Sequence, residues 1–118
     1  MMGRMSRQKG KRGEREAAKA LANLGITARR SQQYCGVAGD SDLITDIDEL
    51  HFEVKRVERL NLYAALEQAE GDRRVSQVPV VLHRRNGKQW AVIHFLKDWN
   101  EIATALHLAQ GRARPEQD

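Results

Sequence analysis

Apolar residues recur at helical spacing from Gly13 onward, and the stripe they form is Ala17, Ala18, Leu21 and Leu24. Gly25 follows the stripe directly and suits a C-terminal helix cap. The pattern therefore predicts an amphipathic helix over residues 13–24. Residues 1–12 are polar and basic and contain two glycines, so we expect a flexible arm there rather than part of the core.

Three strands are expected next. Residues 27–32 predict an exposed or ligand-facing strand, because Arg29, Arg30 and Gln32 are polar. Residues 41–47 and 50–55 are typical of a strand pair joined as a hairpin across Asp48 and Glu49. The apolar packing residues of this pair are Leu43, Ile47, Phe52 and Val54.

The second half of the chain predicts a helix, two strands and a final helix. Asn61 suits the N-cap of a helix that Gly71 ends, and the apolar run 78–83 indicates a strand covered on both faces. The Asn86-Gly87 pair favours a tight hairpin turn into a strand over 89–95. Asp98 and Glu101 stand at capping-box spacing before a helix expected to bury Trp99, Ile102, Ala103 and Leu106, and residues 111–118 form a flexible tail.

The order of these elements is α-β-β-β-α-β-β-α without an internal repeat. It predicts an α/β fold with one mixed β-sheet flanked by helices. A chain of 118 residues is too short for two ordinary domains. We therefore expect a single domain over residues 13–110, between the arm and the tail.

Charge and cysteine content narrow the partners and the compartment. Twenty Lys and Arg against sixteen Asp and Glu give a net charge of +4, which favours an anionic partner. The only cysteine rules out an internal disulfide framework, and no apolar run approaches the roughly 18 residues that span a bilayer. A cytoplasmic protein without a membrane association is expected. Five cations precede the first acidic residue and are candidates for nucleic-acid contact: Arg4, Arg7, Lys9, Lys11 and Arg12.

Candidate chemistry centres on the Glu53-Val54-Lys55 triplet. Side chains two apart on a strand point the same way, so Glu53 and Lys55 share a face. Asp42 lies eleven residues before Glu53, at the start of the preceding strand, so two carboxylates can converge. Such oxygen ligands suit Mg²⁺, with Mn²⁺ as a substitute, and Lys55 could orient a water or offset negative charge. The alternative is an exposed strand face with a weak salt bridge.

Glu14 is a third candidate acid, because it lies at the end of the apolar helix stripe. Its alternative role is that of a first-turn residue stabilised by the helix dipole. Gln68, in the helix after the triplet, is either close to the metal or solvated. His51 shares the face of Glu53 and could approach the site, but it is interpreted as a hydrogen-bonded or peripheral histidine. Arg29, Arg30 and Tyr34 are candidate phosphate contacts.

The chain resembles the PD-(D/E)xK nucleases, most closely archaeal and phage-type Holliday junction resolvases. The resemblance covers residues 9–95 and rests on the segments 9–16 (KGKRGERE), 41–44 (SDLI) and 52–55 (FEVK). It implies a restriction-endonuclease-like core, metal ligation by Asp42, Glu53 and the Val54 carbonyl, an accessory Glu14 and a catalytic Lys55. No proline precedes the metal-site aspartate, which leaves Asp40 as the alternative to Asp42.

This resemblance implies a homodimer that nicks paired strands of a four-way DNA junction, in recombination or repair, inside a bacterial, archaeal or phage-infected cell. The dimer interface is expected at the sheet edge and the last helix, where Trp99, Ile102 and Leu106 are either interface or monomer core. Two alternatives remain. One is a restriction-like or repair nickase with the same site, and the other is a non-catalytic DNA-binding module on the same fold.

Overall fold

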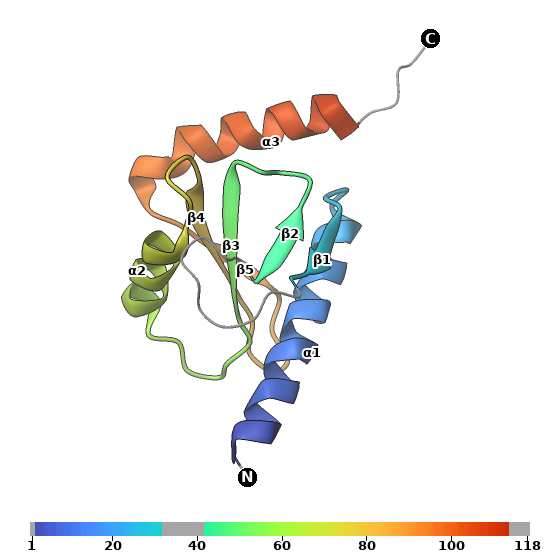
Figure 1. Cartoon of the computed structure of the whole chain (residues 1–118), viewed down its shortest axis with the longest axis vertical. Helices are drawn as coiled ribbons and strands as arrows, with labels where there is room; N and C mark the ends of the chain where they lie inside the picture. The colour runs from blue at the N-terminus through green and yellow to red at the C-terminus, as the bar shows by residue number, and fades with distance from the viewer. Residues whose placement is uncertain (1, 32–41, 114–118) are drawn as a thin grey trace.

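The computed structural model describes residues 2–31 and 42–113, with side chains for residues 10–31 and 42–111. This part of the chain is mixed α/β, with three α-helices and two sheets (Figure 1). The elements are α1 (Met2–Asn23), β1 (Ala28–Arg30), β2 (Leu43–Thr45), β3 (Leu50–Lys55), α2 (Leu62–Asp72), β4 (Val78–His83), β5 (Ala91–Ile93), a 3₁₀ turn η1 (Leu96–Asp98) and α3 (Trp99–Ala113). No helix in the described ranges is long and apolar enough to cross a bilayer.

Helix α1 begins at Met2, so the expected start at Gly13 is wrong and residues 2–12 are helical. These residues contain no proline and are rich in Arg, Lys, Gln and Met, which tolerate a helix well. The predicted stripe is buried at Ala17 and Leu21, but Leu24 lies past the helix end and is 76% exposed. Gly25 adopts a φ of +87°, and the Ile26 N–H donates to the Leu21 carbonyl at 3.0 Å, so the predicted cap is a Schellman motif.

The strands form two sheets rather than the single mixed sheet expected. β1 and β2 pair antiparallel, while β3 pairs parallel with β4, which pairs antiparallel with β5. The expected hairpin between β2 and β3 is therefore wrong in its pairing, because the ladder partners of β2 are on β1. The Thr45 hydroxyl accepts a 3.0 Å hydrogen bond from the Ile47 N–H. This side-chain bond turns the backbone directly after β2.

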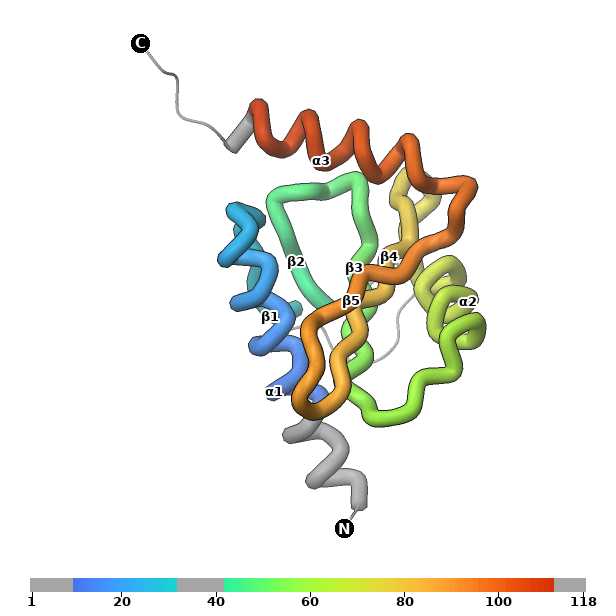
Figure 2. The backbone as a smooth tube through the Cα atoms, turned by 180° about the vertical axis from the view of Figure 1, so that it is seen from behind, coloured from blue at the N-terminus to red at the C-terminus, as the bar shows by residue number. Residues whose placement is uncertain are grey.

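Two apolar clusters lie on opposite faces of β3 and β4. The larger includes Phe52, Val80 and Leu82 with residues of α1 and α3, and the smaller joins Val81 to residues of α2. Figures 1 and 2 show α1 and α2 on opposite sides of this sheet, with α3 running across the ends of its strands. The burial of five of the six residues of β4 follows, and confirms the strand predicted to be covered on both faces.

Three local predictions in the second half were correct in kind, with shifted bounds. Asn61 caps α2 by accepting from the Ala64 N–H at 3.2 Å, although the helix ends at Asp72 instead of Gly71. Gly87 has a φ of +73° in the turn after β4. The connection to β5 spans residues 84–90, so it is a longer loop than a tight two-residue hairpin, and the strand is shorter than predicted.

The last helix buries only part of the predicted face: Ile102 is buried and Leu106 packs against the core, as predicted. Ile102, Ala105 and Ala109 are buried, whereas Trp99 is 61% exposed and Ala103 is exposed. Because η1 precedes α3, Trp99 stands at the very start of the helix, before its buried stripe begins. The helix continues to Ala113, into the range expected to be a tail.

Candidate active site

Asp42 connects the two sheets. Its N–H donates to the Phe52 carbonyl at 3.1 Å, and its own carbonyl accepts from the Ser31 N–H at 3.0 Å. Its side chain Oδ2 accepts from the Val54 N–H at 2.7 Å. These bonds fix the carboxylate at the edge of β3. The predicted convergence of Asp42 with the triplet is therefore present, although it does not come from a regular hairpin.

The Val54 carbonyl points toward the same edge of β3 as the Asp42 carboxylate. In an extended strand the N–H and C=O of one residue point together, and the Val54 N–H is bonded to Asp42. The Lys55 carbonyl points the opposite way, toward β4, where it accepts from the Arg84 N–H at 3.3 Å. Alternation along β3 thus directs the Val54 carbonyl to the Asp42 edge.

Glu53 is almost completely buried, at 3% exposure, on the α2 face of β3. Its Oε1 lies 2.9 Å from Nε2 of His51, which is 0% exposed. His51 Nδ1 has no hydrogen-bond partner in the described part of the chain. The expectation of a hydrogen-bonded histidine is confirmed and the peripheral alternative is wrong. Strand alternation placed His51 beside Glu53, but the sequence did not reveal its complete burial.

Burial is the largest cause that raises the pKa of Asp42, to about 7, and the negative charge of Glu53 is the next. The charge of Glu14 and a hydrogen bond with Glu53 raise the pKa further, while the Val54 N–H lowers it. Asp42 and Glu53 are therefore close enough for strong mutual repulsion when both are ionised. A bound cation would relieve this repulsion.

Glu14 faces the same region from α1. Its Oε1 accepts from Arg30 Nε at 2.9 Å, linking α1 to β1. Burial raises the pKa of Glu14, the Arg30 hydrogen bond and charge lower it, and Glu53 raises it again. Because α1 begins at Met2, Glu14 stands in the middle of the helix, and the first-turn dipole alternative is wrong.

Lys55 and Gln68 form a pair on the α2 side. Lys55 Nζ donates to Gln68 Oε1 at 2.8 Å, so the helix after the triplet orients the ammonium group. Gln68 is exposed, yet its amide is bound rather than merely solvated. The surface exposure predicted for Gln68 is confirmed, whereas its proximity to a metal stays a prediction.

The donor set of this site fits Mg²⁺ in kind. Asp42, Glu53 and the Val54 carbonyl are hard oxygen donors, and Mg²⁺ commonly takes one or two carboxylates with several waters. Within the described ranges no group of three or more His, Cys, Asp and Glu side chains is assembled to hold a metal. The Glu14 carboxylate is bound to Arg30 instead.

The predicted nucleic-acid contacts fall into three groups. Lys11, Arg12 and Arg29 are exposed, whereas Arg30 is partly buried against Glu14. Arg4, Arg7 and Lys9 belong to α1, but their side chains lie outside the described part. Tyr34 falls within residues 32–41, outside the described part of the chain.

Asp40, the alternative to Asp42, also falls within residues 32–41. The contacts of Asp42 therefore carry the assignment.

The chain was compared with protein-family models, curated proteins and solved structures. None of them matches it. The resemblance to PD-(D/E)xK nucleases therefore stays a prediction from short motifs.

Proposed function

We propose that this protein is a magnesium-dependent, structure-specific DNA endonuclease of the PD-(D/E)xK type with a restriction-endonuclease-like core. The single observation that carries the proposal is the bond between Asp42 Oδ2 and the Val54 N–H, at 2.7 Å. This bond brings an acid from before β2 to the strand that carries Glu53 and Lys55. Repulsion between Asp42 and Glu53, visible in the raised pKa of Asp42, supports a cation site.

Each side chain has a distinct role in this proposal. Asp42 and Glu53 would hold Mg²⁺, with the Val54 carbonyl beside them, and Glu14 would assist. The ion would activate a water and polarise the scissile phosphate. Lys55 contributes a positive charge next to the phosphate, where negative charge develops during hydrolysis. Gln68 holds the Lys55 ammonium at 2.8 Å and His51 holds the Glu53 carboxylate at 2.9 Å.

Four-way junctions are the proposed substrate, and a homodimer is the proposed form. Resolution requires two incisions on opposed strands, and a two-fold axis places two identical sites for them. Of the three anchors predicted for the interface, Ile102 is buried in the core and Leu106 packs against it. Trp99 is 61% exposed, Leu96 is 81% exposed and Val92 is 60% exposed. These three exposed apolar side chains are therefore the interface candidates.

The test is cleavage of labelled four-way junction, fork and linear duplex, with Mg²⁺, with Mn²⁺ and with chelator. We expect junction nicking that needs the metal and that Glu53→Gln abolishes. Lys55→Met should slow cleavage by at least about 10²-fold. Lys97→Met is the matched control, because Lys97 is exposed and lies near the amino end of β4, away from Lys55. Metal-independent cleavage, or normal turnover by Glu53→Gln, would refute the proposal.

A further inference from the structure

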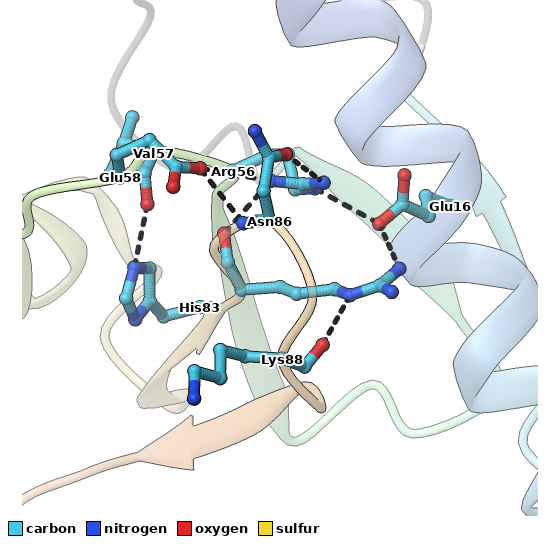
Figure 3. A network of polar contacts seen from close by, with 8 residues as sticks. Glu16, Arg56, Val57, Glu58, His83, Asn86 and Lys88 are labelled. Atoms are coloured by element: carbon cyan, nitrogen blue, oxygen red, sulfur yellow. Dashed lines mark hydrogen bonds and ion pairs between the residues drawn. The ribbon is translucent and has the colours of Figure 1, made fainter.

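A basic surface lies beside the candidate site. It consists of residues 11–13 and 15–16 of α1, residues 56–59 after β3 and the loop 84–90 between β4 and β5, and we call it the hairpin platform. Parallel strands end at the same sheet edge, and Lys55 is in register with His83. The segments that follow β3 and β4 are therefore neighbours. Figure 3 shows the polar contacts that join these segments to α1.

Glu16 holds the platform together. Its Oε1 accepts from Arg56 Nε at 3.0 Å and from Arg84 NH1 at 2.6 Å, so one carboxylate binds two segments (Figure 3). Burial raises the pKa of Glu16, but the hydrogen bonds and charges of Arg84 and Arg56 together hold it below its usual value. Glu16 thus remains ionised while it fixes the loop to the helix.

Further bonds fix the loop to the segment after β3. Arg56 NH2 donates to Asn86 Oδ1 at 2.9 Å, and the Asn86 N–H donates to Glu58 Oε2 at 2.8 Å. His83 Nε2 lies 2.9 Å from the Val57 carbonyl (Figure 3). The loop is therefore held at several points rather than only at its strand ends.

The helix approaches this edge closely at Gly13. A Cβ at Gly13 would lie 2.7 Å from the Arg56 Cβ, so only glycine permits the spacing. Glu14, the accessory acid, is the next residue along α1. The hairpin platform is thereby continuous with the candidate site at two points, beside Glu14 and directly after Lys55.

The platform carries unpaired positive charge. Glu16 and Glu58 are engaged with Arg56 and Arg84. Six other cations are exposed, and their side chains have no ion pair or hydrogen bond within the described part of the chain: Lys11, Arg12, Arg15, Arg59, Arg85 and Lys88. Held on a fixed framework, these cations can bind an extended anion with little loss of backbone entropy.

We propose that the hairpin platform binds the phosphate backbone of a DNA arm that leaves the candidate site, with Arg85 and Lys88 as phosphate contacts. The inference rests on the proposed nuclease function and extends its substrate contact beyond the predicted basic residues of the N-terminal region and β1. A solvated surface would not require the loop to be tied to α1 and to the segment after β3. The unpaired cations are held on a rigid framework beside the proposed metal site, and such an arrangement suits a polyanionic ligand.

The experiment compares the wild type with an Arg85→Gln, Lys88→Gln double variant of the full chain. Binding to a fluorescent four-way junction and to linear duplex is measured by anisotropy in chelator, over a series of salt concentrations. Each lost phosphate contact should reduce the slope of log affinity against log salt by about 0.9. We therefore expect the double variant to lose between about one and two units of slope.

The matched control is an Arg74→Gln, Lys97→Gln double variant, which removes the same charge near the amino end of β4. It should keep the wild-type slope, and thermal unfolding should confirm that both variants are folded. An unchanged slope in the Arg85, Lys88 variant, or an equal loss in the control, would overturn the inference. In that case metal-dependent cleavage by the wild type would still support the nuclease proposal. If only the Arg85, Lys88 variant loses slope and the wild type cleaves no DNA, the nuclease proposal is refuted while the binding inference stands.

Discussion

Neutralising Asp42 should stabilise the metal-free protein. The folded state raises the pKa of Asp42 from 3.8 to about 7, so it binds a proton more tightly than the unfolded chain does. Between these two pH values the folded state carries more protons, and the free energy of unfolding falls as pH rises. Asp42→Asn removes this loss because the amide does not ionise, and its oxygen can still accept from the Val54 N–H.

The size of the effect follows from the pKa difference. At roughly 1.4 kcal/mol per pKa unit, full ionisation of Asp42 in the folded state costs up to about 4 kcal/mol. Asp42 retains partial exposure, so water screens some of this cost and we expect about 2–4 kcal/mol at pH 8. At pH 4 the wild-type side chain is protonated in the fold, and the advantage of the variant should largely disappear.

The assay is denaturant unfolding of wild type and Asp42→Asn in chelator across pH 4 to 8. Asp46→Asn is the control, because Asp46 is exposed, and its stability should stay within about 0.5 kcal/mol of wild type. Saturating Mg²⁺, at a hundredfold excess over its dissociation constant, should add about 2.7 kcal/mol to the wild type and little to Asp42→Asn. A variant less stable than wild type at pH 8, or a gap independent of pH, would refute the reasoning.

Three further variants test individual contacts. Gly13→Ala should destabilise the fold by about 1–3 kcal/mol in thermal or denaturant unfolding, because the new methyl meets the Arg56 Cβ at 2.7 Å. Gly10→Ala, with nothing within 4 Å, should instead be neutral or stabilising, and equal effects at both positions would contradict the packing argument. His51→Leu removes the His51 hydrogen bond of buried Glu53 and should cost about 1–3 kcal/mol, whereas His51→Gln should recover part of that loss. Gln68→Ala should slow cleavage yet change stability by less than about 0.5 kcal/mol, since the pair is exposed; an unchanged rate would remove Gln68 from the site.

Periodicity and short-range signals in the sequence determined much of the local structure. The apolar run 78–83 became β4, the Gly25 cap and the Asn61 N-cap lie where predicted, and Ala17 and Leu21 face the core. These features depend on residues a few positions apart, which is the range over which helix and strand geometry acts. For the same reason the sequence alone placed Glu53 on the face of Lys55.

Tertiary structure decided the contacts between residues far apart in the chain. Only the fold could bring the Asp42 carboxylate to the Val54 N–H and Glu16 to Arg84. It also decided that β2 pairs with β1 and that His51 is completely buried.

The exposure of Trp99 was decided at the same level. The position of a residue in the periodic pattern defines the face of the element on which its side chain lies. The elements packed against that face decide whether water reaches the side chain. The apolar residues at the start of α3 were therefore compatible with either burial or exposure. The placement of η1 before the helix left Trp99 at 61% exposure and gave the buried positions to Ile102, Ala105 and Ala109.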